Sequence, residues 1–232
     1  MKMSIQSQTI LLRWSLVFMI IYGLAFWGLL GMVPPPAPSL TPDQVASFYS
    51  EHAFKIKLGA VVTSITSGFM VPWAVVVGFQ LARNEDGPPV MSVLSVFGGC
   101  LQCLFLVLPC IFWGVAAYTT SRPPEVTALA NEIANILLIT TGQFYIFSLV
   151  PIIYVGLKAK PDPNTAFPRW LCWLAIWVLI IGDTGTVAFM FRTGPFAWNG
   201  LFPFWIPFGL YFSWFSILYY CLFSALKKQS RT

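Results

Sequence analysis

Charged side chains are scarce in this chain of 232 residues, of which only 9% are aspartate, glutamate, lysine or arginine. A soluble globular protein carries roughly 25% charged residues, so this chain has too few to cover a water-facing surface of its size. The shortage excludes an ordinary soluble protein. The net charge of +5 does not form a basic patch among exposed aromatics, which argues against nucleic-acid binding.

Histidine is almost absent, and cysteine occurs in an odd number. His52 is the only histidine, which excludes histidine-rich di-iron sites and haem held by two histidines. It also leaves the segment Cys100-Leu-Gln-Cys103 without partners for zinc. All five cysteines lie in apolar runs, which favours packing residues over disulfides. The chain lacks a nucleophile elbow, a P-loop, a dinucleotide fingerprint and an HExxH motif. We therefore expect no metal and no cofactor.

Hydrophobic residues, in contrast, make up 57% of the chain, and aromatic residues 17%. Several runs of about 20 apolar residues are long enough to cross a bilayer. The sequence predicts an all-α fold, a polytopic transmembrane bundle of six helices that forms one integral membrane domain over residues 1–232. The expected spans cover residues 11–33, 57–81, 91–118, 126–157, 169–192 and 204–226.

The first span has an alternative interpretation, because Lys2 followed by an apolar run imitates a signal peptide. The run is too long and too bulky for that, and no small-x-small cleavage site precedes Pro34. We therefore expect a retained transmembrane helix.

A short amphipathic helix is expected on the outer side before the second span. Thr41 can cap it, Pro42 suits its first position, and Gln44 can complete a capping box. If this helix continues unbroken, Tyr49 and His52 share a face with polar residues of the second span.

The distribution of basic residues predicts the orientation of the chain. With the N-terminus inside, nine lysines and arginines fall in inner segments and four in outer segments, which satisfies the positive-inside rule. The sequence therefore predicts a multi-pass protein of the cell inner (plasma) membrane with both termini cytoplasmic. The inner residues are Lys2, Arg13, Arg83, Lys158, Lys160, Arg169, Lys227, Lys228 and Arg231, and the outer ones are Lys55, Lys57, Arg122 and Arg192.

Asp183 is the most informative ionisable residue, because it lies within an apolar span. A charged group at the centre of a membrane helix costs roughly 2.5–3.5 kcal/mol, so Asp183 is expected to be neutral, paired or in a wet cavity. The neighbouring Gly182 and Thr184 permit close helix approach and supply a hydroxyl. Two interpretations stay open: a proton, cation or ligand site, and a hydrogen-bonded packing residue.

A polar stripe opens the fourth span. Asn131, Glu132 and Asn135 fall within about 120° of one another on a helical wheel. They either line the entry of a polar cavity or form a first turn at headgroup level, where an acidic residue suits the helix dipole.

The remaining candidates lie toward the same outer side. Arg192 either clamps a ligand or anchors its helix at the interface, and His52 is either an acid–base group or a solvated side chain. Trp198 either stacks over a ligand or belongs to an aromatic belt. The inner half offers mainly Gln80, Gln102 and cysteines, so an outward-facing site is expected. Its candidate residues are Tyr49, His52, Asn131, Glu132, Asn135, Asp183, Arg192, Trp198 and Asn199, with Asp183 and Glu132 as the candidates for catalysis.

Two segments, PPPAPSLTPDQVASFYSEH near the first outer loop and FRTGPFAWNGLFPFW near the last, resemble an uncharacterised family of bacterial polytopic membrane proteins of similar length. The resemblance covers most of the chain, and TGPFAWNG is its most specific part. It implies no activity and transfers no catalytic residue. It implies only that the two outer loops belong together.

Three classes of function fit these observations. The leading hypothesis is a non-enzymatic protein that binds, and passes on, a small apolar molecule such as a lipid, sterol or aromatic compound. Its outward-opening cavity would lie between the second, fourth, fifth and sixth spans. The second class is a membrane-embedded acid–base enzyme such as a double-bond isomerase, with Asp183 or Glu132 moving the proton. The third is a structural subunit of a membrane complex. The expected partners are membrane lipid, the apolar molecule, and a second copy or another membrane protein.

Overall fold

The computed structural model describes residues 3–182 and 184–231, and this part of the chain is helical without a β-strand. It contains six helices that are long and apolar enough to cross a membrane. The predicted six-helix transmembrane bundle is thereby confirmed. The six spans are Ile5–Gly28, Ala53–Ala82, Val90–Tyr118, Pro124–Lys158, Arg169–Met190 and Leu201–Gln229.

Most spans consist of two helical segments in sequence. The first span is α1 (Ile5–Gly28), the second is α3 (Ala53–Thr66) and α4 (Met70–Ala82), and the third is α5 (Val90–Leu101) and α6 (Cys103–Tyr118). The fourth is α7 (Pro124–Thr140) and α8 (Ile146–Lys158), the fifth is α9 (Arg169–Gly182) and η3 (Gly185–Met190), and the sixth is η4 (Leu201–Trp205) and α10 (Ile206–Gln229).

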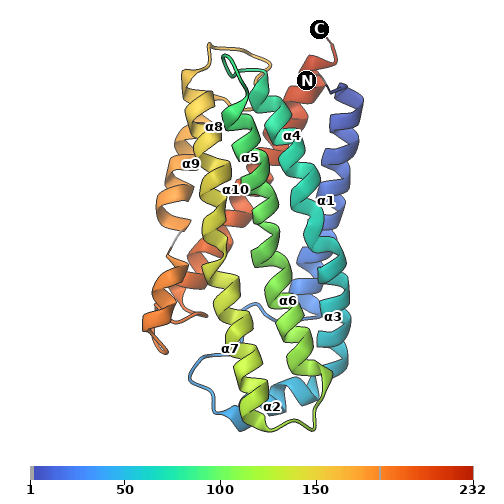
Figure 1. The fold of residues 1–232 in the computed structure, drawn as a ribbon, viewed down its shortest axis with the longest axis vertical. Helices are drawn as coiled ribbons and strands as arrows, with labels where there is room; N and C mark the ends of the chain where they lie inside the picture. Colours follow the sequence, from blue (N-terminus) through green and yellow to red (C-terminus); the bar gives the residue numbers. More distant parts are fainter. Residues whose placement is uncertain (1–2, 183, 232) are drawn as a thin grey trace.

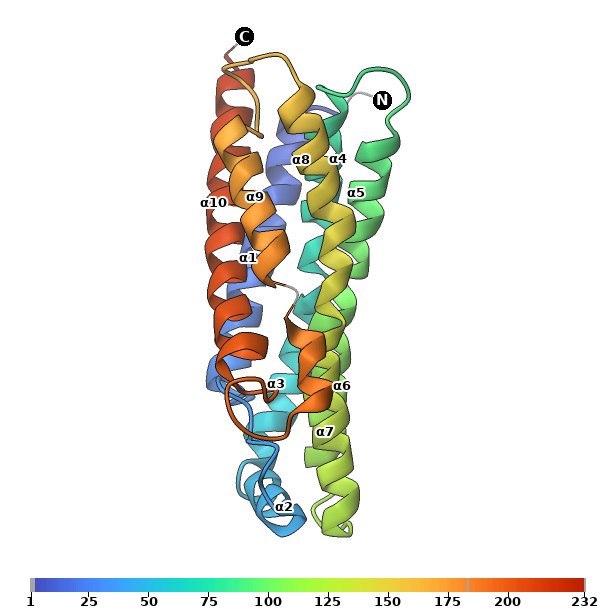
Figure 2. The ribbon, with the colours of Figure 1, turned by 90° about the vertical axis from the view of Figure 1, so that its left-hand side faces the viewer.

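The bundle is elongated, with the start of α1 and the end of α10 at one end, as an even number of spans requires (Figure 1). We call this the terminal end. A short helix, α2 (Pro42–Glu51), lies at the opposite end, which we call the α2 end (Figures 1 and 2).

The first span begins and ends earlier than the expected residues 11–33. Ser4 caps α1 by accepting a hydrogen bond from the backbone N–H of Ser7 at 3.0 Å, so the helix starts before the apolar run does. At the other end Gly31 has a positive φ of 67°, a conformation that favours glycine, and the helix stops at Gly28 before the prolines.

The helix α2 forms as its capping signals predict. Thr41 Oγ1 accepts from Gln44 N at 3.3 Å, and Gln44 Oε1 accepts from Thr41 N at 2.9 Å. The apolar side of α2 packs mainly against α7, where Val45 and Tyr49 are buried. The amphipathic helix therefore covers the end of the bundle.

Small residues bring the central helices together. A Cβ added at Gly98 of α5 would lie 2.7 Å from the backbone nitrogen of Ser148 in α8, and one at Gly99 would clash with Ala74 of α4. Contacts this short leave no room for any side chain, which explains glycine at both positions. The backbones of α4, α5 and α8 are therefore in near contact at the middle of the bundle.

The outer surface of the bundle is apolar, as a lipid-facing surface must be. Several large apolar side chains there are more than half exposed: Trp14, Trp27, Phe54, Trp173, Phe212 and Tyr220.

A cluster of amides closes the terminal end. Gln80 Nε2 donates to Gln8 Oε1 at 2.8 Å and to Gln229 Oε1 at 3.1 Å, and Gln229 Nε2 donates to Gln80 Oε1 at 3.0 Å. All three glutamines are buried. The cluster joins the first, second and sixth spans without any charge.

Candidate functional site

Four of the six spans interrupt their α-helices near the middle of the bundle (Figure 2). Interrupted helices at membrane depth occur where the backbone is buried in protein or lines a cavity, and they commonly form binding sites. The interruptions are η1 (Ser67–Phe69), the junction at Gln102, Thr141 with η2 (Gly142–Tyr145), and the end of α9 at Gly182.

The sequence of these segments explains why they bend. Pro72 has no backbone N–H to continue the helix through η1. Threonine hydroxyls bond to carbonyls one turn earlier: Thr66 to Val62 at 2.7 Å, Thr140 to Ile136 at 2.6 Å and Thr141 to Leu137 at 2.6 Å. Such bonds compete with the helical ladder and bend helices.

The carbonyls near the interruptions find partners on other spans. Ser15 Oγ of α1 donates to Phe69 O at 2.6 Å. Tyr145 Oη donates to Leu179 O at 2.9 Å and to Val178 O at 3.2 Å, in the last turns of α9. Since the last carbonyls of a helix lack partners within that helix, Tyr145 ties the fourth span to the end of α9.

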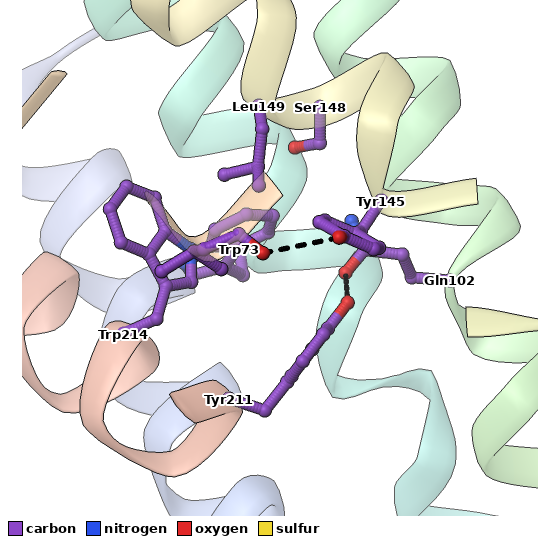
Figure 3. Close-up of a pocket in the computed structure, with 8 residues that line it drawn as sticks. Trp73, Gln102, Tyr145, Ser148, Leu149, Tyr211 and Trp214 are labelled. Carbon is purple, nitrogen blue, oxygen red and sulfur yellow. Dashed lines mark hydrogen bonds between the residues drawn. The ribbon is translucent and has the colours of Figure 1, made fainter. Parts of the chain in front are cut away.

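A small cavity of about 10 Å³ lies among these interruptions (Figure 3). A volume of this size holds about one water molecule. Its lining comes from the second to the sixth spans and consists of Trp73, Gln102, Tyr145, Ser148, Leu149, Val178, Tyr211 and Trp214. We call these residues the central cluster.

The central cluster combines aromatic walls with a few polar groups. Tyr211 Oη donates to Gln102 Oε1 at 2.6 Å, and the Tyr145 and Tyr211 rings meet edge to face with centroids 5.8 Å apart (Figure 3). Two buried polar atoms of the cluster, Trp73 Nε1 and Ser148 Oγ, have no hydrogen-bond partner among the described residues. A buried polar group without a partner costs about 1–3 kcal/mol, so these two atoms favour a polar guest.

The central cluster carries no formal charge, because none of its eight residues is an acid, a lysine, an arginine or a histidine. Within the described part of the chain, no group of three histidine, cysteine, aspartate or glutamate residues is placed to hold a metal ion. The arrangement presents hydrogen-bonding groups in an apolar surrounding.

Three of the residues expected in an outward-facing site meet at the α2 end. Tyr49 Oη donates to Asn131 Oδ1 at 2.8 Å, and Asn135 Nδ2 donates to the same oxygen at 3.1 Å. All three are buried, and Asn135 Oδ1 has no partner in residues 3–182 and 184–231. These three residues join α2 to α7.

The charged candidates and His52 are not part of the group formed by Tyr49, Asn131 and Asn135. Glu132, His52 and Arg192 are exposed, and none lines the central cavity. Successive residues on an α-helix differ in direction by about 100°, so burial of Asn131 and Asn135 turns Glu132 away from them. His52 Nδ1 lies 2.9 Å from Phe48 O of its own helix, and its ring packs on the Phe48 ring.

The last loop at the α2 end is attached to the first. Trp198 is 5% exposed, and its Nε1 donates to Pro36 O at 2.8 Å, while Asn199 is half-buried. The structure therefore connects the two loops that the sequence resemblance placed together. Asp183 lies outside the described residues. Of its neighbours in sequence, Gly182 lies close to Tyr145, since an added Cβ would be 2.9 Å from Tyr145 Oη. Thr184 Oγ1 donates to Phe202 O at 2.5 Å.

Sequence reasoning missed most of the central cluster. It assigned Gln102 to the inner half of the bundle and gave no role to Trp73, Tyr145, Ser148 or Tyr211. A usable signal was present, because Thr141-Gly142-Gln143 interrupts an apolar run near its middle, as Gly68 and Pro72 do in the second span. Aromatic residues near these positions looked like ordinary lipid-facing side chains.

Comparison of the chain with protein-family models, curated proteins and solved structures finds no match.

Proposed function

We propose that the protein binds a small, largely apolar molecule in the central cluster and passes it on through the membrane. The observation that carries this proposal is the convergence of four interrupted spans on buried polar groups, two of which have no partner in the described part of the chain. Interrupted helices near the middle of the membrane form the substrate sites of many transporters.

The lining defines the chemistry of the molecule. Trp73, Tyr145, Tyr211 and Trp214 offer aromatic surface, which favours a flat or ring-containing apolar body. Trp73 Nε1 can only donate a hydrogen bond, whereas the Ser148 hydroxyl donates or accepts. A hydroxyl or carbonyl group on the molecule satisfies both.

Binding requires the spans to separate, because the central cavity of about 10 Å³ admits no organic molecule in the described arrangement. The interruptions supply bending points for this opening. A route toward the α2 end is favoured because two further buried atoms without described partners, Asn135 Oδ1 and Trp113 Nε1, lie on that side, against one, Ser95 Oγ, toward the terminal end. At a rise of 1.5 Å per residue, Asn135 lies about 15 Å along the fourth span from Tyr145, and Trp113 lies about as far along the third span from Gln102.

The proposal includes an orientation. The terminal end faces the cytoplasm of a bacterial plasma membrane, and the α2 end faces outward, as the nine inner and four outer basic residues favour. The amide cluster then closes the cytoplasmic side, and the molecule enters from the outer side or from the outer leaflet.

The test is extraction of the protein, purified in mild detergent from its bacterial membrane, followed by mass spectrometry of the organic extract. We expect one class of apolar molecule to accompany the wild type, and the variant Tyr211→Phe with Ser148→Ala to retain at least tenfold less. Tyr219→Phe is the matched control, since Tyr219 is a buried tyrosine of α10 whose hydroxyl bonds Ser15 outside the central cluster.

Equal retention by the double variant and by the wild type contradicts the proposal. So does equal loss in the control, because the cluster is then a packing feature of a structural subunit. Asp183→Asn in the same assay separates binding from catalysis. A binder that needs only hydrogen bonding keeps the same molecule, whereas an acid–base enzyme without its acid retains unconverted substrate in place of product.

A further inference from the structure

A second and much larger cavity lies at the terminal end, in the loop that joins α8 to α9. Its volume is about 450 Å³, within the range of ligand pockets. Figure 1 shows this loop above the bundle beside the end of α10. The lining residues are Gly156, Ala159, Lys160, Pro161, Asp162, Pro163, Thr165, Phe167, Pro168 and Arg169.

The loop is fixed in place, so the cavity is preformed. Lys228 Nζ donates to Pro163 O at 3.1 Å, and Gln229 Nε2 donates to Asn164 O at 2.9 Å, which attach the loop to α10. Asn164 N donates to Asp162 Oδ1 at 2.8 Å, so one oxygen of the only lining acid is already used within the loop. A fixed cavity binds without the entropic cost of ordering a loop.

Two cations of the cavity are uncommitted. Lys160 and Arg169 are exposed, and neither forms a hydrogen bond or ion pair with its side chain in the described part of the chain. An arginine guanidinium binds the oxygens of a phosphate in pairs, and a lysine adds a point charge. Against these two positive charges stands the single carboxylate of Asp162. The net positive charge of the cavity therefore favours an anion, and a phosphate suits the guanidinium of Arg169.

The surroundings of the cavity favour a lipid as the source of that phosphate. The cavity lies where two spans end, at Lys158 of α8 and at Arg169 of α9. Trp170 and Trp173, on the first turns of α9, are 54% and 59% exposed and face the lipid. Phe167 and Pro168 add an apolar wall beside the cations. A free phosphate makes no apolar contact with this wall, whereas the glycerol and acyl chains of a lipid can pack against it.

We propose that this cavity binds the headgroup of an anionic phospholipid, with Lys160 and Arg169 on its phosphate. Basic pockets at the membrane surface between transmembrane helices bind such headgroups. This site does not rest on the ligand proposed for the central cluster, because the two cavities share no residue.

The test compares the full chain in nanodiscs of phosphatidylglycerol mixed with phosphatidylcholine, using native mass spectrometry to count the lipids that stay bound. Each cation near a membrane surface contributes about fivefold in affinity, so Lys160→Gln with Arg169→Gln is expected to weaken phosphatidylglycerol binding about 25-fold. The control is Lys55→Gln with Lys57→Gln, which removes two exposed cations at the α2 end. It is expected to change nothing.

Four outcomes overturn the proposal. The first is unchanged phosphatidylglycerol binding by the double variant, and the second is an equal loss in the control. The third is displacement of the lipid by millimolar inorganic phosphate, which would assign the cavity to a free anion. Thermal unfolding in pure phosphatidylcholine is expected to be equal for all three proteins, and a lower melting temperature of the double variant would give the cations a structural role instead.

Discussion

At the scale of single residues, the helices of this bundle are held together by positions that tolerate no side chain and by a few directed hydrogen bonds. Gly98 is the clearest case, because a Cβ there would meet backbone atoms of Phe147 and Ser148. Backbone cannot move aside as a flexible side chain can. A methyl group at this position would therefore force α5 and α8 apart.

Gly98→Ala is expected to destabilise the protein by about 1–3 kcal/mol, the usual range for overpacking. Gly23→Ala is the control, because Gly23 is also helical but a Cβ there meets nothing within 4 Å. Alanine at that position is expected to stabilise the helix by about 0.5–1 kcal/mol. Thermal unfolding in detergent measures both, and an equal effect of the two substitutions would contradict the close approach of α5 and α8.

Glu85 caps α5 from the preceding turn. Its carboxylate accepts from Met91 N at 2.7 Å, from Ser92 N at 3.0 Å and from Ser92 Oγ at 2.6 Å. Partial burial alone would raise the pKa of this carboxyl, but the three hydrogen bonds outweigh burial and lower the pKa below 4.5. A lowered pKa in the folded state means that stability is present above pH 4.5 and is lost as the pH falls through the folded-state pKa.

Glu85→Gln is therefore expected to lower stability by about 1 kcal/mol at neutral pH, the usual value of a helix cap. The difference between variant and wild type should shrink as the pH falls through the lowered pKa of the Glu85 carboxyl, because the wild-type carboxyl is then protonated. Asp86→Asn, at the exposed neighbouring position, serves as control. A gap that stays constant with pH would show that the charge of Glu85 is unimportant.

Hydrogen bonds between residues close in sequence could be predicted from the sequence, whereas those between different spans could not. The capping of α2 by Thr41 and Gln44 follows from four consecutive residues, and it was predicted. The Tyr211–Gln102 hydrogen bond joins residues 109 positions apart, and no sequence pattern in either span predicts it. The direction of Glu132 failed to follow from the wheel because a stripe about 120° wide does not say which edge faces the core.

At the scale of helices, the docking of α2 depends on one buried hydroxyl. Tyr49 is 1% exposed and donates to Asn131 at the α2 end of α7. Among the described residues, this bond adds a directed contact to the apolar packing of Val45 and the Tyr49 ring against α7.

Tyr49→Phe is expected to weaken the docking of α2 by about 1 kcal/mol, the net value of such a hydrogen bond. Hydrogen exchange of the α2 amides should then become about fivefold faster, while the amides of α9 and α10 keep their protection. Ser47→Ala, on the exposed side of the same helix, is the control. Faster exchange throughout the protein would instead indicate a loss of global stability.

The helical elements themselves followed from hydropathy, but of their interruptions only the one in the second span followed from the sequence, where Pro72 predicts a kink. Long apolar runs give six spans whether or not the helix is continuous, since hydropathy reports burial in lipid and not backbone geometry. Pro109 and Pro151 stand inside α6 and α8 without ending them, whereas the junction at Gln102 contains no proline. Neighbouring spans, through bonds such as Tyr145 to Leu179, decide where a break is tolerated.

At the scale of the whole molecule, the bundle has two different ends. The terminal end carries the amide cluster and the cationic cavity, and the α2 end carries α2 and the joined loops. We expect reporter fusions to place the terminal end in the cytoplasm: a fluorescent protein fused after the C-terminus should mature, and alkaline phosphatase inserted in the 193–200 loop should be active. The opposite pattern would reverse the orientation and place the amide cluster outside.

The uncharged lining of the central cavity has a consequence for energetics. Moving one elementary charge through the full membrane voltage changes its energy by about 2.3 kcal/mol per 100 mV, whereas a neutral molecule held by tyrosine, tryptophan, serine and glutamine side chains moves no charge at all. Its passage would draw no electrical current. If the proposed molecule is neutral and moves without an accompanying ion, proteoliposomes with an imposed potassium diffusion potential should accumulate it no faster than depolarised ones.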